Sequence, residues 1–454
     1  MVQSAQCDVR FPTTVDGIRS ILAEAEASGQ SVGLRGTGNS YGDPSLNDGG
    51  ILLDLTAMNQ VLCYDREAGV IDVEPGVTLQ DVWERVLPDG WWPPVVSGTM
   101  TTTIAGGAAM NIHGKNNFAV GTLGEHILDF ELMCADGQVL TCSPDENSDV
   151  FYSAIGGFGV LGVFTRLRMA LKRVHSGLLR VEAASVGSFE ETFRWFDEHR
   201  DSSDYMVGWH DGLASGASVG RGLIHAAEGL SEGEDDDPTG TMSHENQVLP
   251  SRLLWVIPKS WLWLGLWFFL SKVGMRLVNA VKFKSGKSEA SRGKMLVSHA
   301  AFHFLLDYVP NWKFAYKPGG LIQYQSFIPN ERAAETCSAL IEKTHQHGFP
   351  PFLVVTKRHR PDPFLMTHGL DGVSMALDIR VTRSNRERVW AMTREMDEIV
   401  LAAGGRFYFA KDSVLRTEIM ERAWPKETVA AFRAMKRRLD PNGLLQSDLF
   451  RRVF

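Results

Sequence analysis

The sequence predicts an α+β fold of two domains, and not a regularly wound α/β sheet. Up to about residue 175, short strand-like and helix-like segments alternate around glycine-rich turns. Residues 320–403 then show the order strand, helix, strand, strand and helix, which is typical of an antiparallel sheet with helices on one side. Two glycine-rich segments, 35–43 and 97–116, each lie beside a strand-like run. This pair predicts two backbone cradles that close on one phosphate-bearing group.

Bulk composition limits the classes of function. The chain has 454 residues, 44% of them hydrophobic and 22% charged, which is ordinary for a globular protein. A net charge of −8 argues against a nucleic-acid binder. The five cysteines are odd in number and show no CxxC spacing, so we expect free thiols, a reducing compartment and no metal site. The N-terminus has neither a basic region nor a long apolar run, which predicts no signal peptide and a cytoplasmic location.

The first 175 residues provide short elements in a clear order. A helix is expected at 14–28, where apolar residues recur at helical spacing and Gly29 follows as a stop signal. A second helix is expected after Thr78, a suitable N-cap. Strands are expected at 32–35, 51–55, 69–73, 127–133 and 158–170.

The middle of the chain changes composition abruptly. Residues 228–237 are rich in acids and predict a mobile, solvated loop. Residues 252–294 contain nine Lys or Arg and the single acid Glu289. Within them, residues 261–270 form an apolar and aromatic run that is too short for a membrane span of about 20 residues. This run is either a buried core helix or an interfacial patch on a membrane, with cations that attract anionic lipid.

The second sheet is expected from strands at 320–328, 352–357 and 374–381. Alternation places Gln323 and Gln325 on one face of the first of these strands and Tyr324 on the other. Helices are expected at 331–347 and 384–403, the latter ending at Gly404-Gly405. The chain closes with a strand-like segment, 407–411, and a helical tail.

The glycine spacing at 36, 38 and 42 differs from that of a nicotinamide-binding turn, which opens a helix. Residues 40–44 resist a helix, so we expect a nest of N–H groups around a pyrophosphate, with a simple turn as the alternative. Small residues at 97–116 would let the backbone pack against a flat ring or a phosphate. The alternatives there are an ordinary tight helix contact at 105–109 and a core histidine at His113.

A combination of motifs resembles the decaprenylphosphoryl-β-D-ribose 2′-oxidase family, which belongs to the vanillyl-alcohol-oxidase type of flavoprotein. The motifs are 38–43, 97–99, 113–116, Gly156-Gly157 with Gly162, Tyr408 with 410–413, 439–441 and 447–448. The resemblance extends over nearly the whole chain and is weakest at 175–300. It implies an FAD-binding domain of two small α/β subdomains at 1–175, a substrate domain at 176–405 with a flexible region at 228–300, and a C-terminal segment, 406–454, that returns to the FAD-binding domain.

The resemblance also implies roles for individual residues. Lys411 is expected near the flavin and the substrate, and Tyr41 and His113 are the candidates for taking or relaying a hydroxyl proton. A substrate pocket for a sugar phosphate is expected at Gln323, Gln325, Lys357 and Ala376. The expected FAD contacts are Arg35, Gly36, Thr37, Gly38, Asn39, Ser40, Tyr41, Gly42, Gly98, Thr99, Thr103, Gly106, Gly107, Asn111, Ile112, Val163 and Tyr408.

Two positions depart from the related proteins. Many related sugar oxidases attach FAD covalently through a histidine in the first glycine loop, where this chain has Asn39, so non-covalent FAD is predicted. Ala376 stands where the best-known members of the family have a cysteine, so we expect thiol-directed covalent inhibition to fail.

The leading hypothesis from the resemblance is FAD-dependent oxidation of the 2′-hydroxyl of a polyprenyl-phosphoryl pentose to a ketone, as a step in arabinan and cell-wall biosynthesis. A partner keto-reductase would complete the epimerisation, and residues 252–294 would contact the inner face of the membrane. One alternative is a soluble aldonolactone or alditol oxidase of the same fold. Another is a non-catalytic scaffold for envelope-assembly enzymes.

Overall fold

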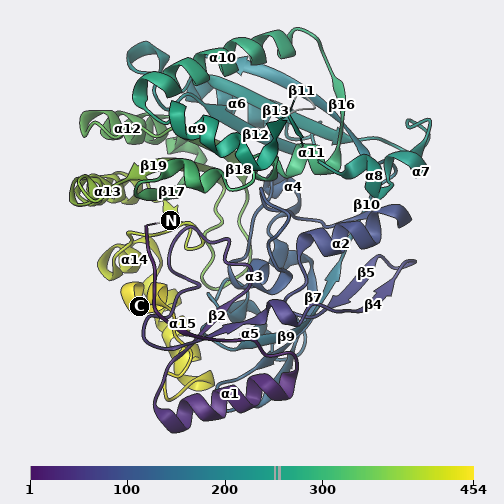
Figure 1. The fold of residues 1–454 in the computed structure, drawn as a ribbon, viewed down its shortest axis with the longest axis vertical. Coiled ribbons are helices and arrows are strands. Elements are labelled where there is room, and N and C mark those ends of the chain that lie inside the picture. The colour runs from purple at the N-terminus through teal and green to yellow at the C-terminus, as the bar shows by residue number, and fades with distance from the viewer. Residues whose placement is uncertain (1, 250–251, 254–256) are drawn as a thin grey trace.

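The computed structural model describes residues 2–249, 252–253 and 257–454. Its first layer is a parallel three-stranded sheet in the order β1-β3-β2, formed by Asp8–Arg10, Ile51–Asp54 and Val32–Arg35. Helix α1 (Val15–Ser28) has Ile18 and Leu22 in the core beside this sheet (Figure 1). Thr14 caps its first turn, and Gly29 ends it at a φ of 69°. The N-terminal helix and its stop signal are therefore confirmed.

The second layer is a five-stranded antiparallel sheet in the order β4-β5-β9-β7-β8. Its strands are Val61–Asp65, Val70–Val73, Val163–Ala170, Ile127–Met133 and Val139–Cys142. Helix α2 (Leu79–Val86) has Thr78 as its N-cap, as the sequence predicts, and the structure adds a capping box between Thr78 and Asp81. The strand expected from residue 158 is wrong at its start. Phe158 and Gly159 have φ of 63° and 73°, so the extended strand begins only at residue 163.

The three-stranded and five-stranded sheets with their helices form the first lobe. The second lobe is built on an eight-stranded sheet in the order β16-β11-β13-β12-β18-β19-β17-β20, with all pairs antiparallel. Helices α6 (Phe189–His199), α12 (Ala333–Gln346) and α13 (Arg386–Ala402) pack together on one face of it. This confirms the expected α+β architecture. The strands are β11 Leu178–Val186, β12 Tyr205–His210, β13 Gly222–Gly229, β16 Met295–Ser298, β17 Gly320–Pro329, β18 Leu353–His359, β19 Gly372–Val381 and β20 Arg406–Phe407.

The strand-like character expected at 407–411 is wrong beyond Phe407. The amides of Lys411 and Asp412 both donate to the carbonyl of Tyr408, so the backbone turns after β20. The turn moves Lys411 off the sheet edge and toward the first glycine loop, where the amide of Tyr41 donates to the carbonyl of Ala410 at 3.0 Å.

Residues 228–300 contain α7 (Pro238–Thr241), α8 (His244–Gln247), a small hairpin (β14 Arg252–Leu253 and β15 Ile257–Pro258), α9 (Leu262–Phe269) and α10 (Lys272–Ala290). Residues 254–256 of the basic stretch lie outside the described residues. The acidic run is a loop, but Arg180 pairs with both Glu228 and Glu234. Asp235 accepts hydrogen bonds from Ser176 and Thr241.

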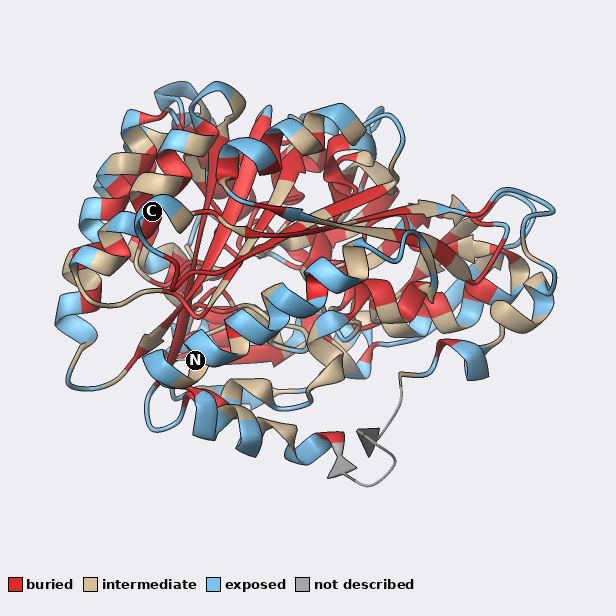
Figure 2. Cartoon of the chain, turned by 90° about the horizontal axis from the view of Figure 1, so that it is seen from above, coloured by how far each residue is buried: buried red, intermediate tan, exposed pale blue. Residues whose placement is uncertain are grey.

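Helix α9 is not a core helix, because none of its residues is buried. Figure 2 shows the contrast with the sheet strands, which are largely buried. The alternative of a buried core helix at 261–270 is therefore wrong. Within the described part of the chain, no single helix has the length and hydropathy to cross a bilayer. Residues 259–269 and α10 reach those values only as a pair, and this pair is bent by 119°.

The C-terminal segment returns to the first lobe. It contains α14 (Thr417–Ala423), α15 (Lys426–Leu439) and α16 (Asp448–Val453). The amide of Val32 donates to the carbonyl of Leu444, and the amide of Gln446 donates to the carbonyl of Val32. The two ends of the chain consequently build one unit, and they lie close together in Figure 1.

Candidate active site

A cavity of about 1090 Å³ lies where the first lobe meets the free face of the eight-stranded sheet. Both glycine-rich segments line it from one side, and side chains of β17, β18 and β19 line it from the other. Its volume lies slightly above the usual range for ligand pockets, about 300–1000 Å³. The cavity therefore has room for a large cofactor together with a substrate.

The first glycine segment follows β2 and packs closely against the second. A side chain at Gly36 would approach Thr103 Oγ1 to 2.3 Å, so this contact requires glycine. Gly38 has a φ of 67°, a conformation that side-chain-bearing residues rarely adopt. Thr37 Oγ1 donates to the carbonyl of Thr101 at 2.6 Å, which joins the two segments. The result is a backbone cradle with little side-chain bulk.

The second segment contributes α3 (Ile104–Ala109), whose N-cap is Thr103. After this helix Asn111 takes a φ of 42°, and its Oδ1 accepts the amide of Gly124 at 3.0 Å. Asn111 Nδ2 is buried and has no protein partner among the described residues. Asn111 itself lies behind the cavity lining, which its neighbours Met110 and Ile112 form.

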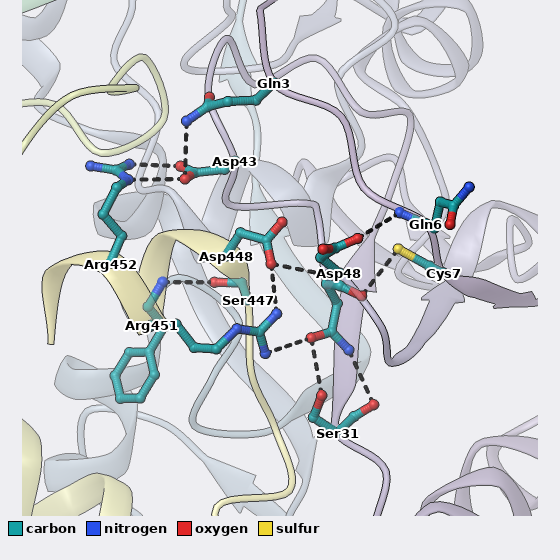
Figure 3. A network of polar contacts seen from close by, with 12 residues as sticks. Gln3, Gln6, Cys7, Ser31, Asp43, Asp48, Ser447, Asp448, Arg451 and Arg452 are labelled. Carbon is teal, nitrogen blue, oxygen red and sulfur yellow. Dashed lines mark hydrogen bonds and ion pairs between the residues drawn. The ribbon is translucent and has the colours of Figure 1, made fainter. Parts of the chain in front are cut away.

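The C-terminal turn is clamped to the first glycine loop. A side chain at Gly42 would come within 1.6 Å of the Asp412 carbonyl oxygen, so the two backbones are in direct contact. Arg452 donates from Nε and Nη2 to Asp43 at 2.9 and 2.7 Å, and its Nη1 lies 2.9 Å from Asp412 Oδ2. Figure 3 shows the paired contacts between Arg452 and Asp43, with Gln3 on the same carboxylate. One arginine of α16 thus holds both sides of the cradle.

This clamp places Lys411 beside Tyr41. Lys411 Nζ lies 3.6 Å from the centroid of the Tyr41 ring, and Lys313 Nζ lies 5.0 Å from the same centroid. Burial raises the pKa of Tyr41 well above its usual value, so the phenol stays protonated near neutrality. Burial lowers the pKa of Lys411; Asp378 opposes this shift, while Lys357 and Lys313 add to it. Lys411 is therefore more easily deprotonated than an exposed lysine.

His113 is buried at the same end of the cavity. Gln325 Nε2 lies 3.0 Å from His113 Nε2, and the amide donates to a neutral imidazole there. Burial lowers the pKa of His113 well below its usual value, and Lys357 lowers it further. His113 Nδ1 has no protein partner among the described residues. The histidine is thus a neutral hydrogen-bonding group with one free nitrogen.

The sheet face supplies the rest of the lining. Gln323 Nε2 donates to Asp378 Oδ1 across the β17–β19 pair, whereas Tyr324 points away and donates to Asp397 at 3.0 Å. Burial lowers the pKa of Lys357 to about 8. Neither Lys357 nor Lys411 has a side-chain hydrogen bond or ion pair within the described residues. Cations without partners in a cavity favour an anionic ligand.

The structure brings most of the expected site residues to one cavity. All of the expected catalytic and substrate-binding residues line it: Lys411, His113, Tyr41, Gln323, Gln325, Lys357 and Ala376. Most of the expected cofactor contacts do so as well: Arg35, Gly36, Thr37, Gly38, Asn39, Ser40, Tyr41, Gly98, Thr99, Thr103, Gly106, Ile112 and Tyr408. Four lie outside the lining: Gly42, Gly107, Asn111 and Val163.

Those four positions lie outside the cavity lining and affect the backbone that forms it. Gly42 meets the C-terminal turn, and Gly107 packs against Leu123. Val163 is fully buried at the start of β9. Their contribution is to the shape of the backbone, and the roles expected for them stay predictions.

Sequence reasoning missed several charged residues at the site. Asp378 follows Ala376 with the two-residue period of β19, so alternation alone could have found it. Lys115 belongs to the motif at 113–116; it lines the cavity and donates to the carbonyl of Phe302. Asp307 accepts from Thr99 Oγ1 and from the amide of Met100, both at 2.8 Å. Nothing local in the sequence indicates that contact.

The residues present fit FAD. Two small-residue backbone cradles, the unpartnered Nδ1 of His113 and lysines without hydrogen-bonding partners suit a pyrophosphate and a flavin. Within the described residues, no group of three or more His, Cys, Asp or Glu side chains is arranged to hold a metal ion.

Comparison with known proteins identifies the first lobe. Residues 8–143 match the family described as FAD binding domain. Decaprenylphosphoryl-beta-D-ribose oxidase of Mycolicibacterium smegmatis is 28% identical over 447 residues, 96% of this chain and 92% of that protein. L-gulonolactone oxidase of Mus musculus is 30% identical over 195 residues, 43% of each chain. Cytokinin dehydrogenase 2 of Arabidopsis thaliana is 28% identical over 163 residues, 35% of this chain and 32% of that one.

The sequence match, the two glycine cradles and the divided first lobe lead to the same assignment, and the non-catalytic scaffold is set aside. The chain is an FAD-dependent oxidoreductase with a fold of the vanillyl-alcohol-oxidase type, and it is similar over nearly its whole length to decaprenylphosphoryl-β-D-ribose oxidase.

Proposed function

We propose that this oxidoreductase converts the 2′-hydroxyl of a polyprenyl-phosphoryl ribose to a ketone. The observation that carries the proposal is the similarity to decaprenylphosphoryl-beta-D-ribose oxidase over 96% of this chain. That similarity includes the second lobe, which supplies the substrate side of the cavity. A keto-reductase would complete an epimerisation to the arabinose form, and both would act at the inner face of the cytoplasmic membrane.

Oxidation of a secondary alcohol removes a hydride from carbon and a proton from oxygen. Bound FAD supplies the hydride acceptor. The protein must therefore orient the hydroxyl and hold its proton. Among the three candidates, Lys411 suits proton transfer best, because burial lowers its pKa and so favours the neutral amine that can take a proton. Its Nζ has no hydrogen-bonding partner within the described residues.

The other two candidates suit different roles. A phenol with a raised pKa at Tyr41 donates a hydrogen bond and does not act as a base near neutrality. His113 accepts from Gln325 on one nitrogen, which leaves Nδ1 to orient or relay. Gln323 and Lys357 provide an amide and a cation for the sugar and its phosphate. Asp378 positions Gln323 through its Oδ1.

The alternative is an aldonolactone or alditol oxidase. L-gulonolactone oxidase supports it, but only over 43% of this chain. Anaerobic mixing with polyprenyl-phosphoryl-ribose, galactono-lactone or xylitol separates the two, with bleaching of the oxidised-flavin absorbance as the readout. We expect bleaching by the lipid-linked ribose alone. Faster bleaching by the lactone or by xylitol would replace the proposed substrate.

Substitution of Lys411 tests the assignment of roles. Lys411→Met should keep the flavin spectrum but slow flavin reduction by about 100-fold or more, as for loss of a general base. The matched control is Lys426→Met, on the exposed side of α15, which should reduce at the wild-type rate. An undiminished rate in Lys411→Met would remove this lysine from the mechanism.

A further inference from the structure

The surface over α9 and α10 concentrates exposed apolar side chains. Within the described residues, eight of the fifteen large hydrophobic side chains that are exposed fall at 261–281. They are Trp261, Leu264, Trp267, Phe268, Phe269, Val273, Leu277 and Val281. An apolar cluster of this density on a folded surface marks an interaction site.

The two helices have distinct inner and outer faces. On α10, Asn279 and Gly286 are buried; Asn279 donates to Asp211 at 2.7 Å, and Gly286 packs against Leu223. Val273, Leu277 and Val281 recur at intervals of four on the outer face. Figure 1 shows α10 along the edge of the second lobe that lies farthest from the C-terminal helices.

The exposed charges around this surface are mostly positive. Lys272, Arg276, Lys284 and Lys287 are exposed on α10. The single acid of the stretch, Glu289, turns inward, where it lies 3.7 Å from His225 and lines the cavity. A basic apolar surface on a chain with a net charge of −8 is complementary to an anionic bilayer.

The same surface adjoins the mouth of the cavity. Leu305 and Phe314 are both exposed and line the cavity. Trp263 of α9 packs edge-on against Phe314 at 5.8 Å, and Trp267 Nε1 donates to the carbonyl of Lys317 at 2.7 Å. Lys282 and Glu289 of α10 also line the cavity. The apolar surface therefore continues into the cavity through the apolar side chains of Leu305 and Phe314.

We propose that α9 and the outer face of α10 dock in the interface of an anionic lipid bilayer and deliver the lipid carrier to the cavity at Leu305 and Phe314. The helices lie in the interface plane, with apolar side chains below the headgroups and the basic flank among them. The carrier chain then stays in the bilayer while its sugar phosphate reaches Lys357 and Lys411. This second part rests on the proposed function, whereas the docking surface does not.

A vesicle co-sedimentation assay tests the surface. We expect the purified holoprotein to pellet with vesicles of phosphatidylglycerol and phosphatidylcholine, and much less with phosphatidylcholine alone. Phe268→Glu with Val273→Glu should abolish pelleting, because both side chains are more than three-quarters exposed and their loss removes no core contact. The control is Phe11→Glu with Leu62→Glu, two exposed apolar residues on the first lobe, which should pellet as wild type.

The basic residues of α10 should each contribute to vesicle binding, so that replacing them weakens binding step by step. Each exposed Lys or Arg near an anionic surface contributes about 5-fold to binding. Replacing Lys272, Arg276, Lys284 and Lys287 by Gln should therefore weaken vesicle binding by about 600-fold, nearly three orders of magnitude. Absence of pelleting, or pelleting that neither set of variants changes, would overturn the proposal. So would lipid-free self-association that Phe268→Glu with Val273→Glu abolishes, which would assign the surface to a second copy of the chain.

Flavin reduction separates this proposal from the proposed function. With a short-chain, water-soluble prenyl-phosphoryl-ribose, the double variant Phe268→Glu with Val273→Glu should reduce its flavin at the wild-type rate. With a long-chain substrate embedded in vesicles, it should be at least about 10-fold slower. Equal rates with the embedded substrate would refute delivery at this surface. A wild-type protein that pellets but is reduced by neither substrate would refute the proposed function alone.

Discussion

Arg452→Ala should destabilise the protein and loosen FAD in the same variant. Asp43 and Asp412 have side chains that are 5% and 8% exposed, and Arg452 pairs with both. Removing one partner of a buried ion pair typically costs about 3–5 kcal/mol, because the remaining charge stays buried. Arg452 itself is 24% exposed, so we expect Arg452→Ala to lower the free energy of unfolding by about 3 kcal/mol, the lower end of this range.

The loss of unfolding free energy in Arg452→Ala should depend on pH. Burial already raises the pKa of Asp43, and Arg452 partly opposes that shift, so the variant raises the pKa further. A carboxyl whose folded pKa lies above its unfolded value destabilises the fold once it ionises, and has no effect where it is protonated in both states. The deficit of Arg452→Ala should therefore be largest at alkaline pH and shrink toward about pH 4, near the unfolded pKa.

Chemical unfolding at several pH values measures the deficit, and the flavin-to-protein absorbance ratio after desalting measures FAD retention. Arg422→Ala is the control. Arg422 pairs with Glu398, and both side chains are more than half exposed, where such a pair is worth about 1 kcal/mol or less. A deficit that is the same at all pH values, or full FAD retention in Arg452→Ala, would refute the clamp.

Three further changes have definite expected results. Gly42→Ala would place a Cβ 1.6 Å from the Asp412 carbonyl oxygen, so it should yield protein with little FAD, measured by the same absorbance ratio. Asp397→Asn should stabilise the fold above about pH 7 and have no effect below about pH 4, because burial raises the pKa of Asp397 to about 7. A shift of about three pKa units sets an upper limit near 4 kcal/mol, checked by unfolding curves. Lys357→Met should raise KM for a phosphorylated substrate with little change in kcat, whereas the exposed control Lys426→Met should change neither; a selective fall in kcat would contradict a binding role.

Local patterns predicted the parts of the fold that local physics determines. Gly29 and Thr78 act within one helical turn, and the structure has the stop signal and the N-cap where the sequence predicts them. Thr14, expected inside the first helix, is instead its N-cap. Alternation also assigned the two faces of β17 correctly, because side-chain direction along a strand follows from the backbone alone. The start of β9 was missed because the apolar pattern runs through Phe158, although Gly159 beside it is a turn signal and both residues have a positive φ.

Tertiary contacts account for what the sequence could not reveal. Lys313 approaches Tyr41 from a segment far away in the chain, and Arg452 reaches the first glycine loop from the last helix. No spacing rule connects such positions. The family resemblance supplied most of the cavity residues, but not the acids that position them, Asp378 and Asp307.

The divided first lobe makes cofactor retention and placement of the catalytic lysine parts of one structural arrangement. The amide of Tyr41 donates to the carbonyl of Ala410, and the backbone of Gly42 touches that of Asp412, so the cradle and the lysine turn cannot move independently. A protein that holds FAD in this cradle must therefore also hold Lys411 over the cavity. Loss of the last helix should then abolish FAD binding and substrate oxidation together, although it removes no residue that lines the cavity.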